Sequence, residues 1–300
     1  IANMSALSFA QHMVNGISLG SLYALIAIGY TMVYGILLMI NFAHGDIVMM
    51  ACYFAFFGIT AFHIPWYFTF IITIIMTALL GVLIERSAYR PLREAPKNSI
   101  LISAIGASFL LENLANYLFS GRPMRFPDVP FLSQNISVGG IEIQAICLVI
   151  PVVTIISLVV LLHIVNHTKT GMAMRAVSKD YEIARVMGIN IDNVISITFI
   201  IGSALAAIGA IMYGIRYPGI TPMMGVMPGL KCFIAAVIGG IGNIKGAVLG
   251  GFILGLGEIL IVAFFPDLSG YRDAFAFIVL IVILFYKPTG LLGEKTTEKV

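Results

Sequence analysis

The apolar positions of this chain form long runs that short polar segments separate. The runs cover residues 11–41, 46–62, 68–84, 100–119, 143–165, 194–215, 246–265 and 274–286. Most reach or approach the ~20 apolar residues that a helix needs to cross a bilayer. They do not alternate over about 10 residues, as the strands of a membrane barrel do. The pattern predicts an all-α, polytopic helical integral membrane protein with about eight transmembrane helices plus short broken or re-entrant segments.

The first run is too long for one ordinary crossing. A helix of its ~31 residues would be roughly 46 Å long, whereas the hydrocarbon core is ~30 Å thick. We expect this run to tilt strongly or to break, at Gly29 and Gly35, and we favour one crossing followed by a break. Residues 230–241 are apolar but short, so they predict a marginal crossing or a re-entrant segment.

The longest polar interruption covers residues 166–193, which we call the ledge, and it predicts two short helices. Ser178, Asp180 and Glu182 supply caps and negative charge at the start of the second helix. Gly188 supplies a left-handed stop at its end. Four basic residues belong to the ledge: Lys169, Arg175, Lys179 and Arg185. A membrane protein with such a folded segment on one side is expected to dock a partner there.

Composition supports the membrane assignment. Only 10% of the residues are charged, against about 25% in soluble domains, which excludes a water-soluble fold. The net charge of +3 is too small to imply nucleic acid. Cys52, Cys147 and Cys232 are isolated in apolar surroundings without metal or redox spacing, so they are interpreted as packing residues.

Lysine and arginine are unevenly distributed between the polar segments. They concentrate at residues 85–98, in the ledge and in the tail from Lys287, so the positive-inside rule places these segments on the cytoplasmic side. The loops at 120–142 and 266–272 then lie outside, provided that residues 230–241 cross. The N-terminus lies outside if the first run crosses once and inside if it breaks into two crossings. The charged tail is expected to be disordered.

Small residues recur every four positions at three places. These are Gly16, Gly20 and Ala24; Gly202, Ala206, Ala210 and Gly214; and Gly242, Gly246 and Gly250. Such faces let helices approach closely in lipid, where hydrophobicity gives no drive to associate. They predict a tight bundle, and a second interpretation is that helices slide along these faces during a transport cycle.

Asn41, His44 and Asp46 lie where the first run is expected to break. In one interpretation Asp46 caps the next helix and His44 belongs to the turn. In the other, the broken helix end lines a substrate path, as in other transporters.

A second polar set shares one helix face, because Ser108, Glu112 and Asn116 are spaced four apart. A carboxylate in hydrocarbon costs about 2.5–3.5 kcal/mol on insertion scales, so this face should meet protein or water. Polar contacts between helices and a lining of the translocation path are both open. Glu258 likewise points at a neighbouring helix, with Lys231 as its candidate partner.

No catalytic or metal chemistry is predicted. His163 and His167 are four apart but lack the glutamate of the zinc-protease motif. Residues 239–246 are glycine-rich but have neither the G-x-G-x-x-G pattern nor the Walker Lys-Ser/Thr ending. We therefore expect no enzyme activity, no ATP hydrolysis and no cofactor on this chain.

Residues 182–188 (EIARVMG) resemble the Glu-Ala-Ala-x-x-x-Gly coupling loop of bacterial ABC importer permeases, with Ile183 replacing the middle alanine. In that family the short helix of the loop sits in a groove of the ATP-hydrolysing subunit and transmits its closure to the spans. The resemblance implies that Glu182, Ala184, Met187 and Gly188 contact the ATPase.

The resemblance extends over almost the whole chain. Residues 16–25 (GISLGSLYAL), 29–35 (GYTMVYG), 40–46 (INFAHGD) and 236–242 (AVIGGIG) are similar to the H-type permease of bacterial high-affinity branched-chain amino-acid importers. This implies a single permease domain over 1–300, in the bacterial inner membrane, for leucine, isoleucine and valine.

The same resemblance implies a set of partners. They are an M-type permease that completes a heterodimer, two ATP-binding subunits that hold ATP and Mg²⁺, and a periplasmic amino-acid-binding protein. Urea or short amides remain rival substrates within the family, and a secondary amino-acid transporter is the alternative of another class.

Overall fold

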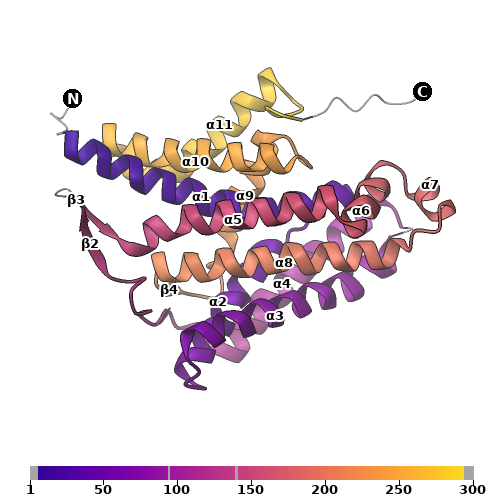
Figure 1. Cartoon of the computed structure of the whole chain (residues 1–300), viewed down its shortest axis with the longest axis horizontal. Helices are drawn as coiled ribbons and strands as arrows, with labels where there is room; N and C mark the ends of the chain where they lie inside the picture. The colour runs from indigo at the N-terminus through magenta and orange to yellow at the C-terminus, as the bar shows by residue number, and fades with distance from the viewer. Residues whose placement is uncertain (1–5, 94, 139–140, 294–300) are drawn as a thin grey trace.

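The computed structural model describes residues 6–93, 95–138 and 141–293. Within them, seven helices are long and apolar enough to cross a membrane, and two shorter apolar helices accompany them. All pack into one bundle (Figure 1). The expected fold class is confirmed. The two shorter helices correspond to the apolar runs at residues 46–62 and 230–241.

The bundle consists of α1 (Ala6–Leu37), α2 (His44–Thr60), α3 (Trp66–Ile84), α4 (Lys97–Phe119), α5 (Ala145–His167), α8 (Ile191–Arg216), α9 (Val226–Gly239), α10 (Ile244–Phe264) and α11 (Arg272–Tyr286). The ledge adds α6 (Lys169–Lys179) and α7 (Tyr181–Val186). A π-helical turn (Glu85–Tyr89) and a 3-10 turn (Arg90–Leu92) follow α3, and a 3-10 turn (Pro266–Tyr271) precedes α11.

Two small antiparallel sheets lie at one end of the bundle. Strand β1 (Met124–Arg125) pairs with β4 (Gly219–Ile220), and β2 (Asn135–Val138) pairs with β3 (Ile141–Gln144). The N-terminal end of α1 lies here too, because Gln11 Nε2 donates to the carbonyl oxygen of Glu142 at 3.1 Å. We call this the hairpin end.

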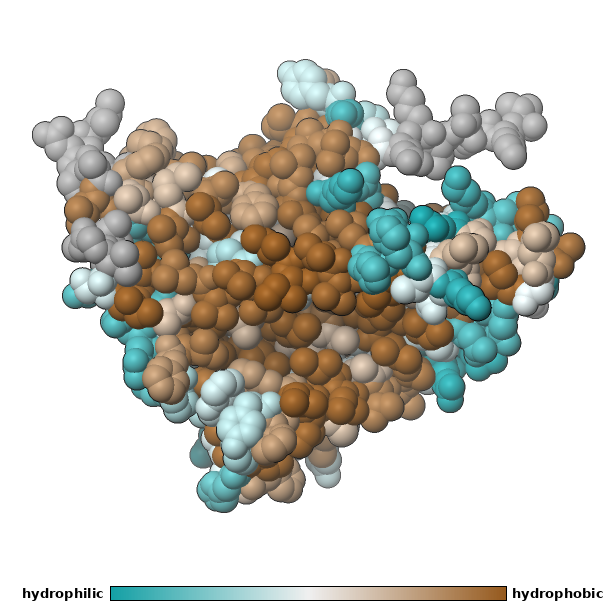
Figure 2. Space-filling model, in the orientation of Figure 1, coloured by the Kyte–Doolittle hydropathy of each residue, from teal (hydrophilic) through white to brown (hydrophobic). Residues whose placement is uncertain are grey.

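The ledge lies at the opposite end, which we call the ledge end (Figure 1). Hydrophilic residues gather over the ledge, while hydrophobic residues cover the middle of the bundle (Figure 2). The chain therefore has an apolar belt between two polar ends, as a bilayer requires.

Helix α1 is the centre of the bundle and packs against α5, α8, α9 and α10. Every residue from 18 to 33 is buried. The expected break at Gly29 and Gly35 is wrong, because both glycines lie within the continuous helix and face other backbones, Gly202 and Gly242 respectively. The chain turns only after Leu37, through Leu38 with φ 54°.

The predicted tight packing of small residues is confirmed. A Cβ atom placed on Gly20 of α1 would lie 2.9 Å from the Cα atom of Phe252 on α10, and one on Gly16 would lie 2.9 Å from Leu256 Cδ2. On α9 and α10, Gly239 and Gly246 meet backbone to backbone. The small residues therefore bring helix axes close together, as packing in lipid requires.

The bundle contains an inverted repeat that the sequence analysis did not identify. Helices α1 to α4 correspond to α8 to α11: α1 packs on α9 and α10, while α8 packs on α2 and α3. Figure 1 shows that α1 starts at the hairpin end and α8 at the ledge end, so the halves run in opposite directions. Positions 24–29 (ALIAIG) and 204–209 (ALAAIG) match at this offset.

The expectation of a disordered tail is wrong for residues 287–293. The amides of Leu291 and Leu292 donate to the carbonyl oxygens of Ile238 and Gly239, each at 2.8 Å. These carbonyls belong to the last turn of α9 and have no partner within the helix, so the tail satisfies them. The rest of the expected disordered tail, residues 294–300, lies outside the described part of the chain.

Candidate functional site

The ledge folds as the sequence predicts, with α7 closed at both ends. Asp180 Oδ1 accepts a hydrogen bond from the amide of Ile183 at 3.0 Å. Gly188 follows α7 with φ 80°, the left-handed conformation that ends helices. Ser178 is no cap, because it lies inside α6 and its hydroxyl donates to the carbonyl of Arg175 at 2.9 Å.

Helix α7 turns most of its side chains away from the bundle. Ala184 is buried, with 2% exposed, whereas Val186 and Met187 are 86% and 75% exposed. Glu182 and Gly188 are exposed as well. In Figure 1, α7 is the outermost element of the ledge end. Ala184 packs α7 against the bundle, while the exposed apolar side chains of Val186 and Met187 suit contact with a partner protein.

Tyr181 connects α7 to α1. Its hydroxyl donates to the carbonyl oxygen of Ile36 at 2.5 Å. Ile36 lies in the last turn of α1, where carbonyls lack a partner within the helix. Burial raises the pKa of Tyr181, against a smaller lowering by the Arg93 guanidinium, so the hydroxyl keeps its proton at neutral pH.

An ion-pair network at the same end joins the segment after α3 to the start of α8. Arg93 pairs with both Glu85 and Asp192, and Arg90 pairs with Asp192 at 2.5 Å. Glu85 is buried and also accepts a hydrogen bond from Ser196 at 2.9 Å. These contacts hold the two segments together beside the ledge.

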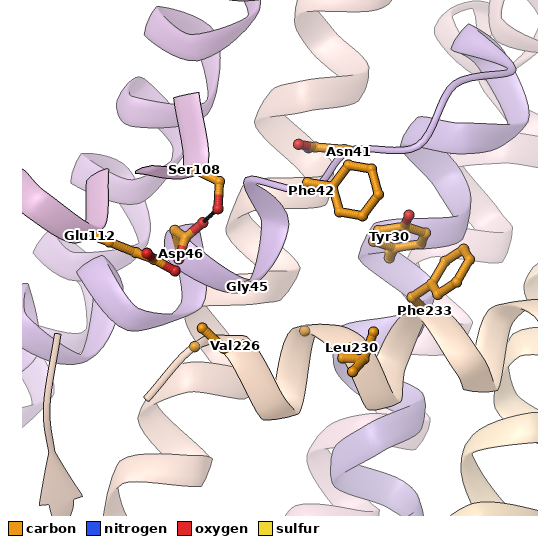
Figure 3. Close-up of a pocket in the computed structure, with 12 residues that line it drawn as sticks. Tyr30, Asn41, Phe42, Gly45, Asp46, Ser108, Glu112, Val226, Leu230 and Phe233 are labelled. Atoms are coloured by element: carbon orange, nitrogen blue, oxygen red, sulfur yellow. Dashed lines mark hydrogen bonds between the residues drawn. The ribbon is translucent and has the colours of Figure 1, made fainter. Parts of the chain in front are cut away.

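A cavity of about 150 Å³ lies between α1, α2, α4 and α9 (Figure 3). Four of the six candidate path residues line it: Asn41, Asp46, Ser108 and Glu112. The other lining residues are Tyr30, Phe42, Gly45, Gly225, Val226, Gly229, Leu230 and Phe233.

Asp46 does not cap α2. The N-cap position is Ala43, which provides no side-chain cap, and Asp46 lies within the first turn. Its Oδ2 accepts a hydrogen bond from the Ser108 hydroxyl at 2.5 Å, so it points toward α4 (Figure 3). The first run and the Ser108 face therefore meet at this cavity.

His44 does not line the cavity but fixes the depth at which α2 begins. Its Nε2 lies 3.2 Å from the carbonyl oxygen of Ile26, and its ring meets Tyr30 edge-on at 5.5 Å. Ile26 precedes the end of α1 at Leu37 by eleven residues, or about 16 Å of helix. The chain thus folds back along α1, and α2 starts inside the bundle.

Asn41 is held from the ledge end. Its Oδ1 accepts a hydrogen bond at 2.8 Å from the hydroxyl of Tyr89, the last residue of the π-helical turn. Tyr89 and Tyr181 are not predicted as site residues, because nothing in their local sequence shows that the fold brings them to Asn41 and Ile36.

Asn116 lies outside this cavity. It lines a separate pocket of about 330 Å³ with Thr221, Pro222 and other residues. Glu112 lines both pockets. The face that Ser108, Glu112 and Asn116 share on α4 therefore borders first the cavity and then, further along the helix, this second pocket.

Between the two halves of the repeat, the short helices α2 and α9 meet at their N-termini inside the bundle. A Cβ atom on Gly45 would lie 2.5 Å from the carbonyl oxygen of Gly225, and one on Gly225 would collide with the carbonyl of Gly45. These two glycines are equivalent in the repeat, as are Cys52 and Cys232. Their equal spacing in the sequence is the signal by which the second half of the cavity could have been found.

Metal chemistry has no site in the described part of the chain, which holds no group of three or more His, Cys, Asp or Glu side chains suited to an ion. His163 and His167 stack on each other with centroids 5.2 Å apart. All three cysteines are free and buried, which agrees with their interpretation as packing residues.

The fold and the site define a class: a multi-pass helical membrane protein with a short helix begun at depth, a cavity beside it and an exposed ledge at one end. The permease BraD of the high-affinity branched-chain amino acid transport system of Pseudomonas aeruginosa is 42% identical over 97% of this chain and 98% of its own. The corresponding permease LivH of Escherichia coli is 42% identical over 98% of both chains.

One solved structure shows the same fold. The chain resembles PsaBC from Streptococcus pneumoniae in complex with Fab, with a TM-score of 0.50 at 13% identity, over 95% of this chain and 93% of that one. The family model of the branched-chain amino acid transport system permease component matches residues 12–284. The chain belongs to this family of permease components.

Proposed function

We propose that this chain is one transmembrane subunit of an ABC importer for branched-chain amino acids in the bacterial inner membrane. It forms a single permease domain over residues 1–300, with 166–193 as the coupling region. A second, M-type permease completes the heterodimer, and two partner ATP-binding subunits hold ATP and Mg²⁺. A periplasmic binding protein delivers the amino acid.

The exposed end of α7 is the observation that carries the proposal. Val186 and Met187 are bare apolar side chains on a capped helix beside exposed Glu182 and Gly188. Ala184 seats this helix, and Tyr181 joins it to the end of α1. A partner that grips α7 therefore acts on α1, and α1 leads into the loop at the cavity.

Charge sets the orientation. The ledge end carries the arginines of the segment after α3 and the basic residues of α6 and α7, so the positive-inside rule places it in the cytoplasm. The ATP-binding subunits then dock on α7 from inside, and the binding protein docks at the hairpin end.

The test is reconstitution of the five-component complex in liposomes with ATP inside and labelled leucine outside. We expect leucine uptake that needs ATP, both ATPase subunits and the binding protein. Uptake at the full rate without the ATPase subunits would show a secondary transporter instead. Uptake of urea or acetamide in place of leucine would assign the rival substrates.

Substitutions on the ledge test the coupling role. Glu182→Ala and Met187→Ala should each weaken copurification of the ATPase subunits and lower ATP-driven uptake. Met172→Ala is the matched control, because Met172 is a 63% exposed methionine on α6, outside residues 182–188, which carry the proposed contact with the ATPase. Equal effects of Met172→Ala and Met187→Ala would contradict the assignment.

A further inference from the structure

The cavity between α1, α2, α4 and α9 has a polar side and an apolar side. Figure 3 shows Asp46, Ser108 and Glu112 on one side and Tyr30, Phe42 and Phe233 on the other. Leu230 extends the apolar side from α9. A ligand that fits must therefore be polar at one end and apolar at the other.

The polar side holds two carboxylates and no counter-cation. No lysine, arginine or histidine belongs to the described residues that line the cavity. Asp46 receives one hydrogen bond from Ser108, and Glu112 takes part in no ion pair among the described residues. Carboxylates at membrane depth are costly unless a partner meets them, so this side suits a ligand ammonium group.

A hydrogen-bond donor without a partner among the described residues lines the cavity as well. Asn41 is 2% exposed and lines the cavity, and its Nδ2 has no hydrogen-bond partner among the described residues. Its Oδ1 is occupied by Tyr89, which fixes the amide. The first turn of α2 begins here without a side-chain cap, so the positive end of its dipole adds to the donor. Together they suit a ligand carboxylate.

The apolar side has room for a small hydrocarbon group. The rings of Tyr30 and Phe233 meet edge-on with centroids 5.8 Å apart, and Leu230 lies beside them. The whole cavity, polar and apolar sides together, measures about 150 Å³, the volume of an engineered protein cavity that binds benzene, so only a small ligand fits.

We propose that this cavity binds a zwitterionic α-amino acid with an apolar side chain during its passage. Asp46 and Glu112 hold the ammonium group, and Asn41 with the N-terminus of α2 holds the carboxylate. Tyr30, Leu230 and Phe233 surround the side chain. The assignment rests on the proposed import of amino acids and adds where, and by which groups, the membrane subunit selects them.

The test uses a leucine analogue that carries a photoreactive diazirine in its side chain. The complete complex in lipid nanodiscs is irradiated during ATP hydrolysis, digested and analysed by mass spectrometry. We expect the label on α9 peptides that contain Leu230 and Phe233, or on Tyr30. Excess leucine should abolish labelling, whereas 4-methylpentanoate and isoamylamine, which lack the ammonium and the carboxylate respectively, should compete about tenfold less well.

The double variant Asp46→Asn with Glu112→Gln should reduce labelling by about tenfold or more while ATP hydrolysis and partner binding persist. Asp128→Asn is the matched control, since its carboxylate is 73% exposed near the hairpin end and should leave labelling unchanged. Label at other residues, full labelling of the double variant, or equal competition by 4-methylpentanoate would overturn the site.

A second variant covers the case in which the double variant does not assemble. Phe233→Ala enlarges the apolar side and keeps every polar group, so phenylalanine should gain against leucine as a competitor by about fivefold. An unchanged ratio contradicts the site. If the wild-type complex labels but transports no leucine, the proposed import function fails; if it transports leucine but labels elsewhere, only this site fails.

Discussion

Glu258 is a carboxylate with no exposed surface, placed within the apolar part of α10. Lys231 Nζ lies 2.9 Å from its Oε1, Arg272 Nε lies 3.0 Å from its Oε2, and the Tyr23 hydroxyl donates to Oε2 at 3.1 Å. Lys231 also pairs with Asp273 at 2.7 Å. The network ties α1, α9, α10 and the start of α11 together, which compensates for the cost of buried charge.

We predict that Glu258→Gln lowers stability more than it changes substrate preference. The amide removes the buried anion that Lys231 and Arg272 share and leaves Lys231 only the half-exposed Asp273; breaking comparable buried pairs costs about 3 kcal/mol. Thermal unfolding of the purified complex and uptake competition between amino acids measure the two effects. Asp128→Asn should leave the melting temperature unchanged, and normal stability with an altered substrate preference would overturn the structural role.

The hydroxyl of Tyr181 gives a second prediction at this scale. Tyr181→Phe keeps the ring of the ledge residue in place and removes the bond to Ile36, worth about 1 kcal/mol. We expect severalfold less leucine uptake per ATP hydrolysed, with ATP hydrolysis itself retained. Tyr117→Phe, at an 86% exposed position of α4, is the control. An unchanged ratio of leucine uptake to ATP hydrolysis would show that the hydrogen bond from Tyr181 to Ile36 does not couple α7 to α1.

Sequence reasoning reached those residues whose partners follow from helix periodicity and failed for those that meet across loops. Lys231 was the candidate partner of Glu258, which was expected to point at a neighbouring helix, and the structure confirms the pair. Arg272 was missed because it reaches Glu258 from the turn before α11, and a turn has no period from which its direction can be derived.

At the scale of elements, the apolar runs located the spans within a few residues, because the thickness of the bilayer sets how many apolar residues a crossing helix needs. The break in the first run was misplaced, since glycine weakens a helix only where no neighbour packs against it. Gly29 and Gly35 face other backbones, so they serve close approach instead. The strand pairs at the hairpin end were missed because the strands are short: β2 and β3 alternate polar and apolar residues, but over only four residues each.

The crossing of α2 and α9 supplies the prediction at this scale. Gly45→Ala adds a methyl group 2.5 Å from the carbonyl of Gly225 and should destabilise the protein by about 1–3 kcal/mol, with reduced uptake. Gly106→Ala is the matched control: it lies in helix α4 with no atom within 4 Å of the added carbon, so stability should rise slightly. Equal melting temperatures for the two variants would refute the tight crossing.

The molecule as a whole has two chemically different ends, and this sets its direction in the membrane. The three native thiols are buried, so single cysteines can be introduced without background labelling. We predict that Met187→Cys reacts with an impermeant maleimide only after the cytoplasmic side is opened. Asp128→Cys, near the hairpin end, should react in intact cells, and the reverse pattern would contradict the orientation.

The inverted repeat also belongs to the scale of the whole molecule, and its trace in the sequence is weak for a physical reason. The two halves face different neighbours, so most of their side chains have diverged. Identity survives where backbones touch, as at Gly45 and Gly225. The polar side of the cavity comes from one half alone, because Asp46 corresponds to Val226.

The π-helical turn that ends at Tyr89 makes the cavity sensitive to chain length outside it. An α-helix rotates about 100° for each residue, so a single deletion within Glu85–Tyr89 swings every following side chain through that angle. The Tyr89 hydroxyl then no longer reaches Asn41, and the side-chain amide of Asn41 can rotate where it lines the cavity. The one extra residue of the π-helical turn therefore sets the orientation of the Asn41 side chain through the position of Tyr89.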